Sequence, residues 1–232
     1  MTHSNARDLL CHAAARLGSL RERVMFVGGA TTWLHVTDPA ARPSRQTKDV
    51  DIVVEVTDRA GYYRLGDELR ALGFVEDSRE GAPICRWCAD DLVVDLLPTD
   101  GDLLGFSNRW YRAAMDRARE HPLEHVGPIR VARATDFLAM KLEAFGDRGG
   151  GDYLASKDLE DIVSVIDGRP EIVAELAYAD PAIQSYIREE LRRLFDDTSF
   201  EEAIYGHFGG DPIEQARVPL TLGRLRMIAG LE

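Results

Sequence analysis

Phe26–Val54, with the sequence FVGGATTWLHVTDPAARPSRQTKDVDIVV, is the stretch that decides the predicted fold. It begins as a short apolar strand, turns at Gly28-Gly29 into a helix, and ends in a second strand that carries Asp49-Val50-Asp51. Successive side chains of a strand point to opposite faces, so Asp49 and Asp51 share one face. Two carboxylates side by side repel each other unless a cation lies between them. The pair therefore predicts a divalent metal site, and its hard oxygen ligands suit Mg²⁺ or Mn²⁺.

The Gly28-Gly29 turn in front of this pair suits a phosphate-binding role. Glycine lets a backbone approach a ligand closely, and the free N–H groups at a helix N-terminus attract phosphate. Each signal alone is weak, because Gly-Gly is a common turn and Asp-x-Asp is a common solvated surface pair. Their order, a phosphate cradle followed by a metal-binding pair, favours a site for a nucleoside triphosphate.

A third carboxylate is predicted from the stretch Leu92–Leu97. This stretch is expected to form a hairpin with Ile84–Trp87 around Asp90-Asp91. Asp95 is the only charge within the apolar run, and a central strand seldom keeps a lone carboxylate without a partner. An edge strand with its polar face in water is the alternative. We expect instead that strand pairing places Asp95 beside the other two carboxylates.

These motifs together resemble a known family. Gly28-Gly29, followed by Lys48-Asp49-Val50-Asp51-Ile52-Val53, looks like the core signature of the nucleotidyltransferase (DNA polymerase β-like) superfamily. More closely, the chain resembles the AbiEii branch, which includes the MenT-type toxins, and the resemblance covers about residues 26–168. The resemblance implies that Asp95 completes an acidic triad that binds metal and helps to deprotonate the attacking hydroxyl.

Two later helices carry the remaining candidate site residues. Lys141 lies on the apolar stripe of Thr135–Phe145, so its ammonium must reach solvent or pair with a negative group, such as a triphosphate or an acid of the next helix. That next helix, Ser156–Asp167, carries Asp158 and Asp161. In the AbiEii branch a lysine and an aspartate on successive helices complete the active site. The resemblance leaves open which aspartate corresponds, with Asp158 slightly favoured.

Basic residues in two other segments can be interpreted either as substrate contacts or as solvent-exposed side chains. The predicted loop Thr37–Lys48 carries Arg42, Arg45 and Lys48, which either contact substrate phosphates or face water. The predicted helix Asn108–Arg119 is locally basic and aromatic, which suits either contact with a nucleic acid or a solvated helix with buried rings.

Composition limits the partners and the compartment. The chain has 232 residues and a net charge of −12, which argues against broad nucleic-acid binding but not against a local basic groove. Its three cysteines, Cys11, Cys85 and Cys88, are too few for a disulfide framework. Cys85 and Cys88 form a lone C-x-x-C, which lacks the second pair that a four-ligand zinc site needs. No apolar run approaches the ~20 residues of a bilayer span. The first ten residues are too polar for a signal peptide, so we expect a cytoplasmic protein with no membrane partner.

The predicted fold class is α+β, a polymerase β-like nucleotidyltransferase fold in which a small mixed sheet with helices on one side precedes a helical C-terminal region. We expect residues 1–133 to form the nucleotidyltransferase core with the sheet and the metal site, and residues 134–232 to form a helical region that completes the active site. The remaining elements are predicted as an opening helix Asn5–Leu20, a helix Ala60–Leu72, a hairpin around Gly127-Pro128, a break at Gly149-Gly150-Gly151, and C-terminal helices Glu171–Tyr178, Pro181–Phe195, Phe200–Phe208 and Leu220–Ile228.

The predicted reaction moves NMP from an NTP to an acceptor hydroxyl and releases pyrophosphate. Two Mg²⁺ or Mn²⁺ ions on Asp49, Asp51 and Asp95 would hold the triphosphate and lower the pKa of the acceptor. Gly28, Gly29, Lys48, Lys141 and Asp161 are the predicted nucleotide-binding residues, and Lys141 would neutralise charge on the phosphates. Asp158 or Asp161 would orient Lys141 or a substrate hydroxyl.

The sequence alone does not identify the acceptor. The resemblance points to the tRNA 3′ end and to a toxin with a cognate antitoxin protein, while a protein or a small molecule is also compatible with the residues. The alternative class is a non-catalytic nucleotide- or partner-binding module with the same fold. Such a module would be expected to lack one of the carboxylates or the lysine, and this sequence has Asp49, Asp51, Asp95 and Lys141. A metal-dependent phosphohydrolase is disfavoured because no histidine lies near the carboxylate strands.

Overall fold

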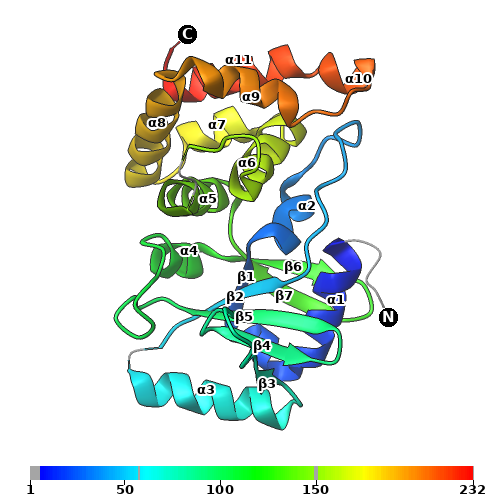
Figure 1. Ribbon diagram of the computed structural model, residues 1–232, viewed down its shortest axis with the longest axis vertical. Helices are drawn as coiled ribbons and strands as arrows, with labels where there is room; N and C mark the ends of the chain where they lie inside the picture. Colours follow the sequence, from blue (N-terminus) through cyan, green and yellow to red (C-terminus); the bar gives the residue numbers. More distant parts are fainter. Residues whose placement is uncertain (1–5, 57, 149–150, 232) are drawn as a thin grey trace. The chain divides into compact units, whose positions relative to one another are not determined.

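The computed structural model describes residues 6–56, 58–148 and 151–231, which divide into two compact units. One unit contains residues up to 33 together with 46–133, and the other contains residues 34–45 together with those from 134 onward. The strands, all in the first unit (Figure 1), are β1 (Val24–Val27), β2 (Val50–Val54), β3 (Val75–Glu76), β4 (Arg86–Ala89), β5 (Leu92–Pro98), β6 (Arg119–Leu123) and β7 (Gly127–Val131).

The first unit is built on a seven-stranded mixed sheet with the order β3-β4-β5-β2-β1-β7-β6. The pairs β2/β5 and β1/β7 are parallel, and the others are antiparallel. All four residues of β1 are buried, as expected for an apolar strand in the middle of a sheet. The predicted α+β class with a mixed sheet is therefore confirmed.

Within its described residues, the first unit also contains three longer helices and two 3₁₀ helices. They are α1 (Ala6–Leu17), α3 (Arg59–Ala71) and α4 (Tyr111–Arg117), with the 3₁₀ helices η1 (Gly18–Glu22) and η2 (Gly29–Thr31). In α1 the buried residues lie at helical spacing and include Leu9, Leu10, Ala13, Ala14 and Leu17. Asp58 caps α3 by accepting a hydrogen bond from the Gly61 N–H, and Gly73 follows its C-terminus with a φ of 85°.

Three predicted elements of this unit differ from the structure. The helix after Gly29 is only η2 continued by the short α2 (Thr32–His35), and α4 begins at Tyr111 rather than at Asn108. The predicted turn at Gly127-Pro128 is wrong, because β6 and β7 pair on either side of residues 124–126. Here His125 adopts the left-handed conformation, with a φ of 62°, so a non-glycine residue makes the turn that glycine was expected to make.

The second unit is helical in its described residues (Figure 1). Its helices are α5 (Ala134–Arg148), α6 (Lys157–Gly168), α7 (Ile172–Ala177), α8 (Pro181–Phe195), α9 (Thr198–Gly206), α10 (Pro212–Gln215) and α11 (Val218–Ala229). The predicted helices are confirmed within a few residues, and α10 was not predicted. Gly149 and Gly150 of the predicted break lie outside the described residues.

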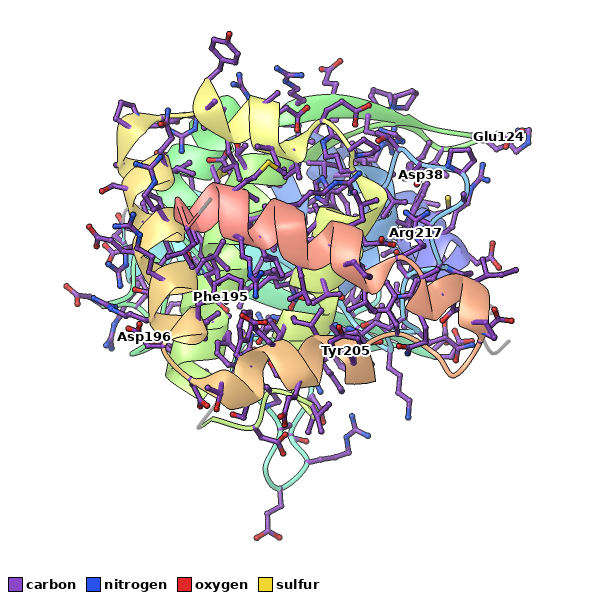
Figure 2. All side chains as sticks on the ribbon, turned by 90° about the horizontal axis from the view of Figure 1, so that it is seen from above. Asp38, Glu124, Phe195, Asp196, Tyr205 and Arg217 are labelled. Carbon is purple, nitrogen blue, oxygen red and sulfur yellow. The ribbon has the colours of Figure 1, made fainter. Side chains whose placement is uncertain are left out.

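Arg217, just before α11, ties the segment 34–45 into this unit. Its Nη2 donates to Asp38 at 2.7 Å and its Nε donates to Asp167 at 2.9 Å (Figure 2 labels Arg217 and Asp38). Asp167 is fully buried, so this arginine supplies the charge that makes its burial tolerable. The loop that precedes the Asp49 strand is thereby anchored on helix α6.

The structure also bears on disulfides and on membrane spans. Cys11, Cys85 and Cys88 are free thiols. Across the described ranges, every helix falls short of the length and apolar character that a membrane span requires.

Candidate functional site

Three carboxylates and one arginine lie together on adjacent strands of the first unit. Parallel pairing of β2 with β5 places Asp51 directly opposite Asp95. Antiparallel pairing of β4 with β5 places Arg86 on the other side of Asp95. Asp49 precedes β2 and shares the face of Asp51, since the two are two positions apart. The predicted position of Asp95 beside Asp51 is thus observed, and we name these four residues the acidic row.

Arg86 is the member of the acidic row that the sequence interpretation missed. Its Nε and Nη2 donate to the two oxygens of Asp95 at 2.9 and 2.8 Å, and Nη2 also reaches Oδ2 of Asp49 at 3.0 Å. The hydrogen bonds from Arg86 to Asp95 raise the pKa of the guanidinium above its ordinary value. A signal was available, because counting outward from the predicted turn at Asp90-Asp91 pairs Arg86 with Asp95.

The acidic row suits a hard divalent cation in donor type and in charge. Its three carboxylates and one guanidinium leave a formal excess of two negative charges, and the guanidinium contacts Asp49 and Asp95. Carboxylate oxygens are the ligands that Mg²⁺ prefers. Within the described residues, however, no three His, Cys, Asp or Glu side chains already converge in a geometry that could hold a metal ion. Arg86 is the cation that bridges Asp49 and Asp95 in this arrangement.

Gly28 borders the acidic row at the end of β1. Val27 pairs with Asp51, so the turn that follows β1 lies next to this carboxylate. Gly28 has a φ of 73°, and a Cβ added there would overlap with the Asp51 carboxylate. Gly29 then begins η2, where the Thr31 hydroxyl donates to the Gly28 carbonyl at 2.9 Å. The glycine at 28 is therefore required by both conformation and space, whereas binding of phosphate at Gly28 and Gly29 stays a prediction.

We expect Gly28→Ala to destabilise the protein more than Gly81→Ala does, by about 1–3 kcal/mol, because only the first overpacks a neighbour. Gly81 is a matched control, since it also has a positive φ, of 79°, but has nothing within 4 Å of its added Cβ. Urea unfolding of both variants measures the difference. Equal losses would show that the contact with Asp51 contributes nothing beyond the shared conformational strain.

The second unit holds a cluster of opposite sign, which we name the basic cluster. Lys141 of α5 pairs with Asp158 at 2.9 Å and with Asp161 at 2.6 Å, both on α6. Arg45 donates to both oxygens of Asp161, each at 2.9 Å, and Arg148 pairs with Asp158 at 3.1 Å. Three cations against two carboxylates leave a formal excess of one positive charge.

Local structure explains why these side chains meet. Ser156 caps α6 by accepting a hydrogen bond from the Leu159 N–H at 3.2 Å, which fixes where the helix begins. Asp158 and Asp161 are then three residues apart and share a helix face. Lys141 therefore contacts both of the aspartates between which the sequence could not choose.

Burial and charge act against each other in the basic cluster. Burial alone would lower the pKa of the Lys141 ammonium, but the charges of Asp161 and Asp158 outweigh it and hold that pKa above its ordinary value. Burial would likewise raise the pKa of Asp161, but Lys141 and Arg45 hold it below its ordinary value. Both groups are therefore charged at neutral pH, and Lys141 has the acidic partner on the next helix that the sequence called for.

The remaining predicted cations are dispersed. Lys48 is exposed directly before Asp49. Arg42 donates to the Ser164 hydroxyl at 3.4 Å and lies over the Phe208 ring at 5.5 Å. On α4, Arg112 forms an exposed ion pair with Glu55 at 3.1 Å. Of the three loop cations, Arg42 and Arg45 thus contact protein groups of the second unit.

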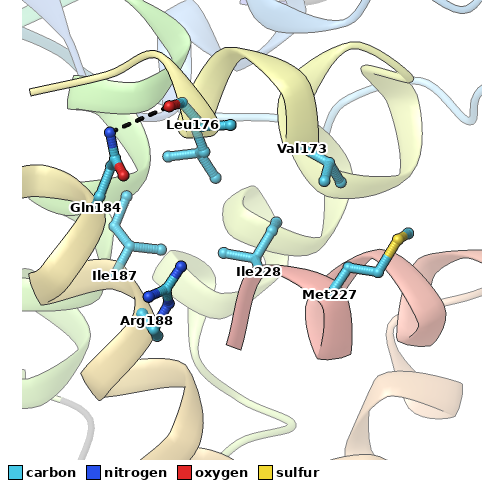
Figure 3. A pocket seen from close by; sticks show the side chains of 8 residues that line it. Val173, Leu176, Gln184, Ile187, Arg188, Met227 and Ile228 are labelled. Carbon is cyan, nitrogen blue, oxygen red and sulfur yellow. Dashed lines mark hydrogen bonds between the residues drawn. The ribbon is translucent and has the colours of Figure 1, made fainter. Parts of the chain in front are cut away.

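A cavity of about 130 Å³ lies elsewhere in the second unit, among α7, α8 and α11 (Figure 3). Its lining is apolar except for Gln184 and Arg188, and Gln184 donates to the Ala177 carbonyl at 3.3 Å. None of the predicted site residues lines it. The cavity therefore does not belong to either charged cluster.

The comparison with known proteins defines the fold. No protein-family model and no curated protein matches the chain. An antigenic nucleotidyltransferase-like protein from Paracoccidioides brasiliensis superposes with a TM-score of 0.52 at 18% identity, over 88% of this chain and 94% of that one. A putative nucleotidyltransferase from H. pylori gives a TM-score of 0.46 at 11% identity, over 97% of this chain and 94% of that one. The chain therefore has a nucleotidyltransferase-like fold.

Proposed function

We propose that this protein is a metal-dependent nucleotidyltransferase that transfers NMP from an NTP to an acceptor hydroxyl and releases pyrophosphate. The observation that carries the proposal is the acidic row, in which Asp51 lies opposite Asp95 with Asp49 on the same face. It occurs on a nucleotidyltransferase-like fold. A divalent ion, when bound, would neutralise phosphate charge and lower the pKa of the acceptor hydroxyl.

In this proposal the carboxylates of the acidic row and the residues beside them have separate tasks. Asp49, Asp51 and Asp95 hold the ion or ions, and Asp95 helps to take the proton from the acceptor hydroxyl. Gly28 leaves the space in which Asp51 sits and lets the backbone approach the triphosphate. Lys48, exposed beside Asp49, pairs with the outer phosphates.

The basic cluster serves the same reaction through its excess positive charge. Lys141 neutralises charge that develops on the α-phosphate or on the pyrophosphate leaving group. Asp158 and Asp161 orient Lys141, since both carboxylates form ion pairs with its ammonium. The already charged state of Lys141 at neutral pH suits this electrostatic role and not that of a general base.

The acceptor proposed first is the 3′ end of tRNA, with the protein acting as a toxin that a cognate antitoxin neutralises. This rests on the resemblance of Gly28-Gly29, Lys48–Val53, Lys141 and Lys157–Ile162 to the AbiEii branch. The net charge of −12 restricts such an acceptor to a small footprint, in keeping with contact at one RNA end rather than along a duplex.

The test is incubation with each α-³²P-labelled NTP and Mg²⁺, supplied separately with total tRNA, a protein extract or no macromolecule. A labelled tRNA band that disappears in Asp51→Asn supports the proposal and identifies the nucleotide. A labelled protein band instead overturns the tRNA acceptor but keeps the nucleotidyl transfer. Absence of labelled product with every acceptor and every NTP, while NTP still binds, favours the non-catalytic module.

A further inference from the structure

Arg86 occupies the position in which a cation would be expected between two carboxylates. Both oxygens of Asp95 accept from its guanidinium, at 2.9 and 2.8 Å, and Oδ2 of Asp49 accepts from the same Nη2 at 3.0 Å. The other oxygen of Asp49 accepts from the Thr47 hydroxyl at 2.9 Å. Each of the four oxygens on these two carboxylates therefore already has a donor.

The two contacts of Arg86 differ in strength. The interaction with Asp95 is bidentate, which suits the planar fork of a guanidinium, and the side chain of Asp95 is only 10% exposed. The contact with Asp49 is a single bond to a carboxylate that is 36% exposed. An arriving cation would therefore meet less resistance in displacing Arg86 from Asp49 than from Asp95.

Repulsion among the carboxylates explains why a positively charged side chain lies between them. Without a cation, three neighbouring carboxylates would repel one another and lower the stability of the sheet. Arginine stays protonated at any physiological pH, so it compensates this repulsion permanently. A divalent ion needs the same carboxylate oxygens, and a positive charge held among them opposes its entry.

We propose that Arg86 is a built-in competitor of the divalent ion, which neutralises the acidic row before the ion arrives and gives up Asp49 when it binds, while continuing to position Asp95. This inference rests on the proposed function, since it assumes an ion at Asp49, Asp51 and Asp95. Arg86 acts through these carboxylates and is therefore a positioning residue. Its effect is on the affinity for the ion rather than on the chemistry of transfer.

The experiment is calorimetric titration of Mn²⁺ into the full chain without nucleotide. Arg86→Gln is expected to bind Mn²⁺ about tenfold more tightly than wild type or better, because a positive charge at hydrogen-bond distance from the ligands is removed. The matched control is Arg112→Gln, which removes an arginine whose side chain is 52% exposed and whose partner, Glu55, is itself 54% exposed and lies outside the acidic row. Arg112→Gln should bind as wild type does.

The outcomes separate this inference from the proposed function. Tighter binding by Arg86→Gln alone, including binding that wild type lacks, supports the competition. Equal or weaker binding by Arg86→Gln overturns it and leaves the metal site standing. Absence of binding in wild type and in Arg86→Gln alike overturns both.

Arg86→Lys covers the case in which the glutamine variant does not fold. Lysine keeps the charge but makes a point contact in place of the fork, so its hold on Asp95 and Asp49 is weaker. We expect its Mn²⁺ affinity to lie between those of wild type and Arg86→Gln. We also expect Mn²⁺ to raise its melting temperature more than that of wild type, and equal shifts would contradict the inference.

Discussion

Asp51→Asn is expected to reduce nucleotidyl transfer by more than the ~10- to 100-fold that loss of an outer-shell partner of a metal site costs, because it removes a proposed metal ligand itself. Asp51 lies directly opposite Asp95, and asparagine keeps its shape while removing the charge. Removing one of three neighbouring like charges also relieves repulsion. The melting temperature should therefore stay the same or rise while the initial rate of transfer collapses.

The control for this prediction is Asp67→Asn on α3, an aspartate whose side chain is 75% exposed and pairs with Arg70 outside the acidic row. It should retain the wild-type rate. Asp49→Asn should behave as Asp51→Asn does. Rates within a few-fold of wild type in both Asp49→Asn and Asp51→Asn would rule out the metal assignment.

Asp161→Asn is expected to lower the free energy of unfolding by about 3–5 kcal/mol, the usual cost of breaking a buried ion pair. Its side chain is fully buried and compensates both Lys141 and Arg45. Asp158→Asn should cost less, because Lys141 would keep Asp161 as a partner and the other partner of Asp158, Arg148, is 71% exposed. Chemical denaturation of the two variants compares them, and equal losses would contradict this division between the aspartates.

The pH dependence of this effect has a definite direction. The pKa of Asp161 is lowered in the folded state, so its ion pairs stabilise the protein above the ordinary aspartate pKa of about 3.9. That stabilisation is lost as the pH falls from this value through the lowered pKa of the folded state. The difference between wild type and Asp161→Asn should therefore be constant near neutral pH and shrink below about pH 4.

The two aspartates also separate by activity. If Asp158 orients Lys141 for transfer, as the sequence slightly favours, Asp158→Asn will lose rate without losing much stability. A variant that keeps both its rate and its stability would move the orienting role to Asp161. Measuring rate and unfolding on the same preparations makes this distinction.

Local patterns predicted the three carboxylates of the acidic row, because short stretches of sequence determine which of these side chains share a face. Alternation placed Asp49 and Asp51 on one face, and the isolated charge of Asp95 in an apolar run indicated a partner. The same hairpin geometry would have identified Arg86 opposite Asp95. A pattern of metal ligands does not include it, because a guanidinium has no acceptor atom.

Long-range pairs could not be predicted in this way. Arg45 and Asp161 are 116 positions apart, and no periodicity links a polar loop to a particular helix face. Arg45 was therefore interpreted as a cation for phosphate or solvent. The predicted position of the turn between β6 and β7 is wrong for a local reason. His125 adopts the left-handed conformation, which glycine adopts far more readily.

Parallel reactions with α-³²P- and γ-³²P-labelled NTP, in the presence of Mg²⁺ and acceptor, test the central claim most directly. Nucleotidyl transfer breaks the bond between the α- and β-phosphates, so the α label should enter the acceptor and the γ label should appear in pyrophosphate. Both signals should be lost in Asp51→Asn. A γ label in the acceptor, or an α label released as free nucleotide without any labelled acceptor, would contradict the account.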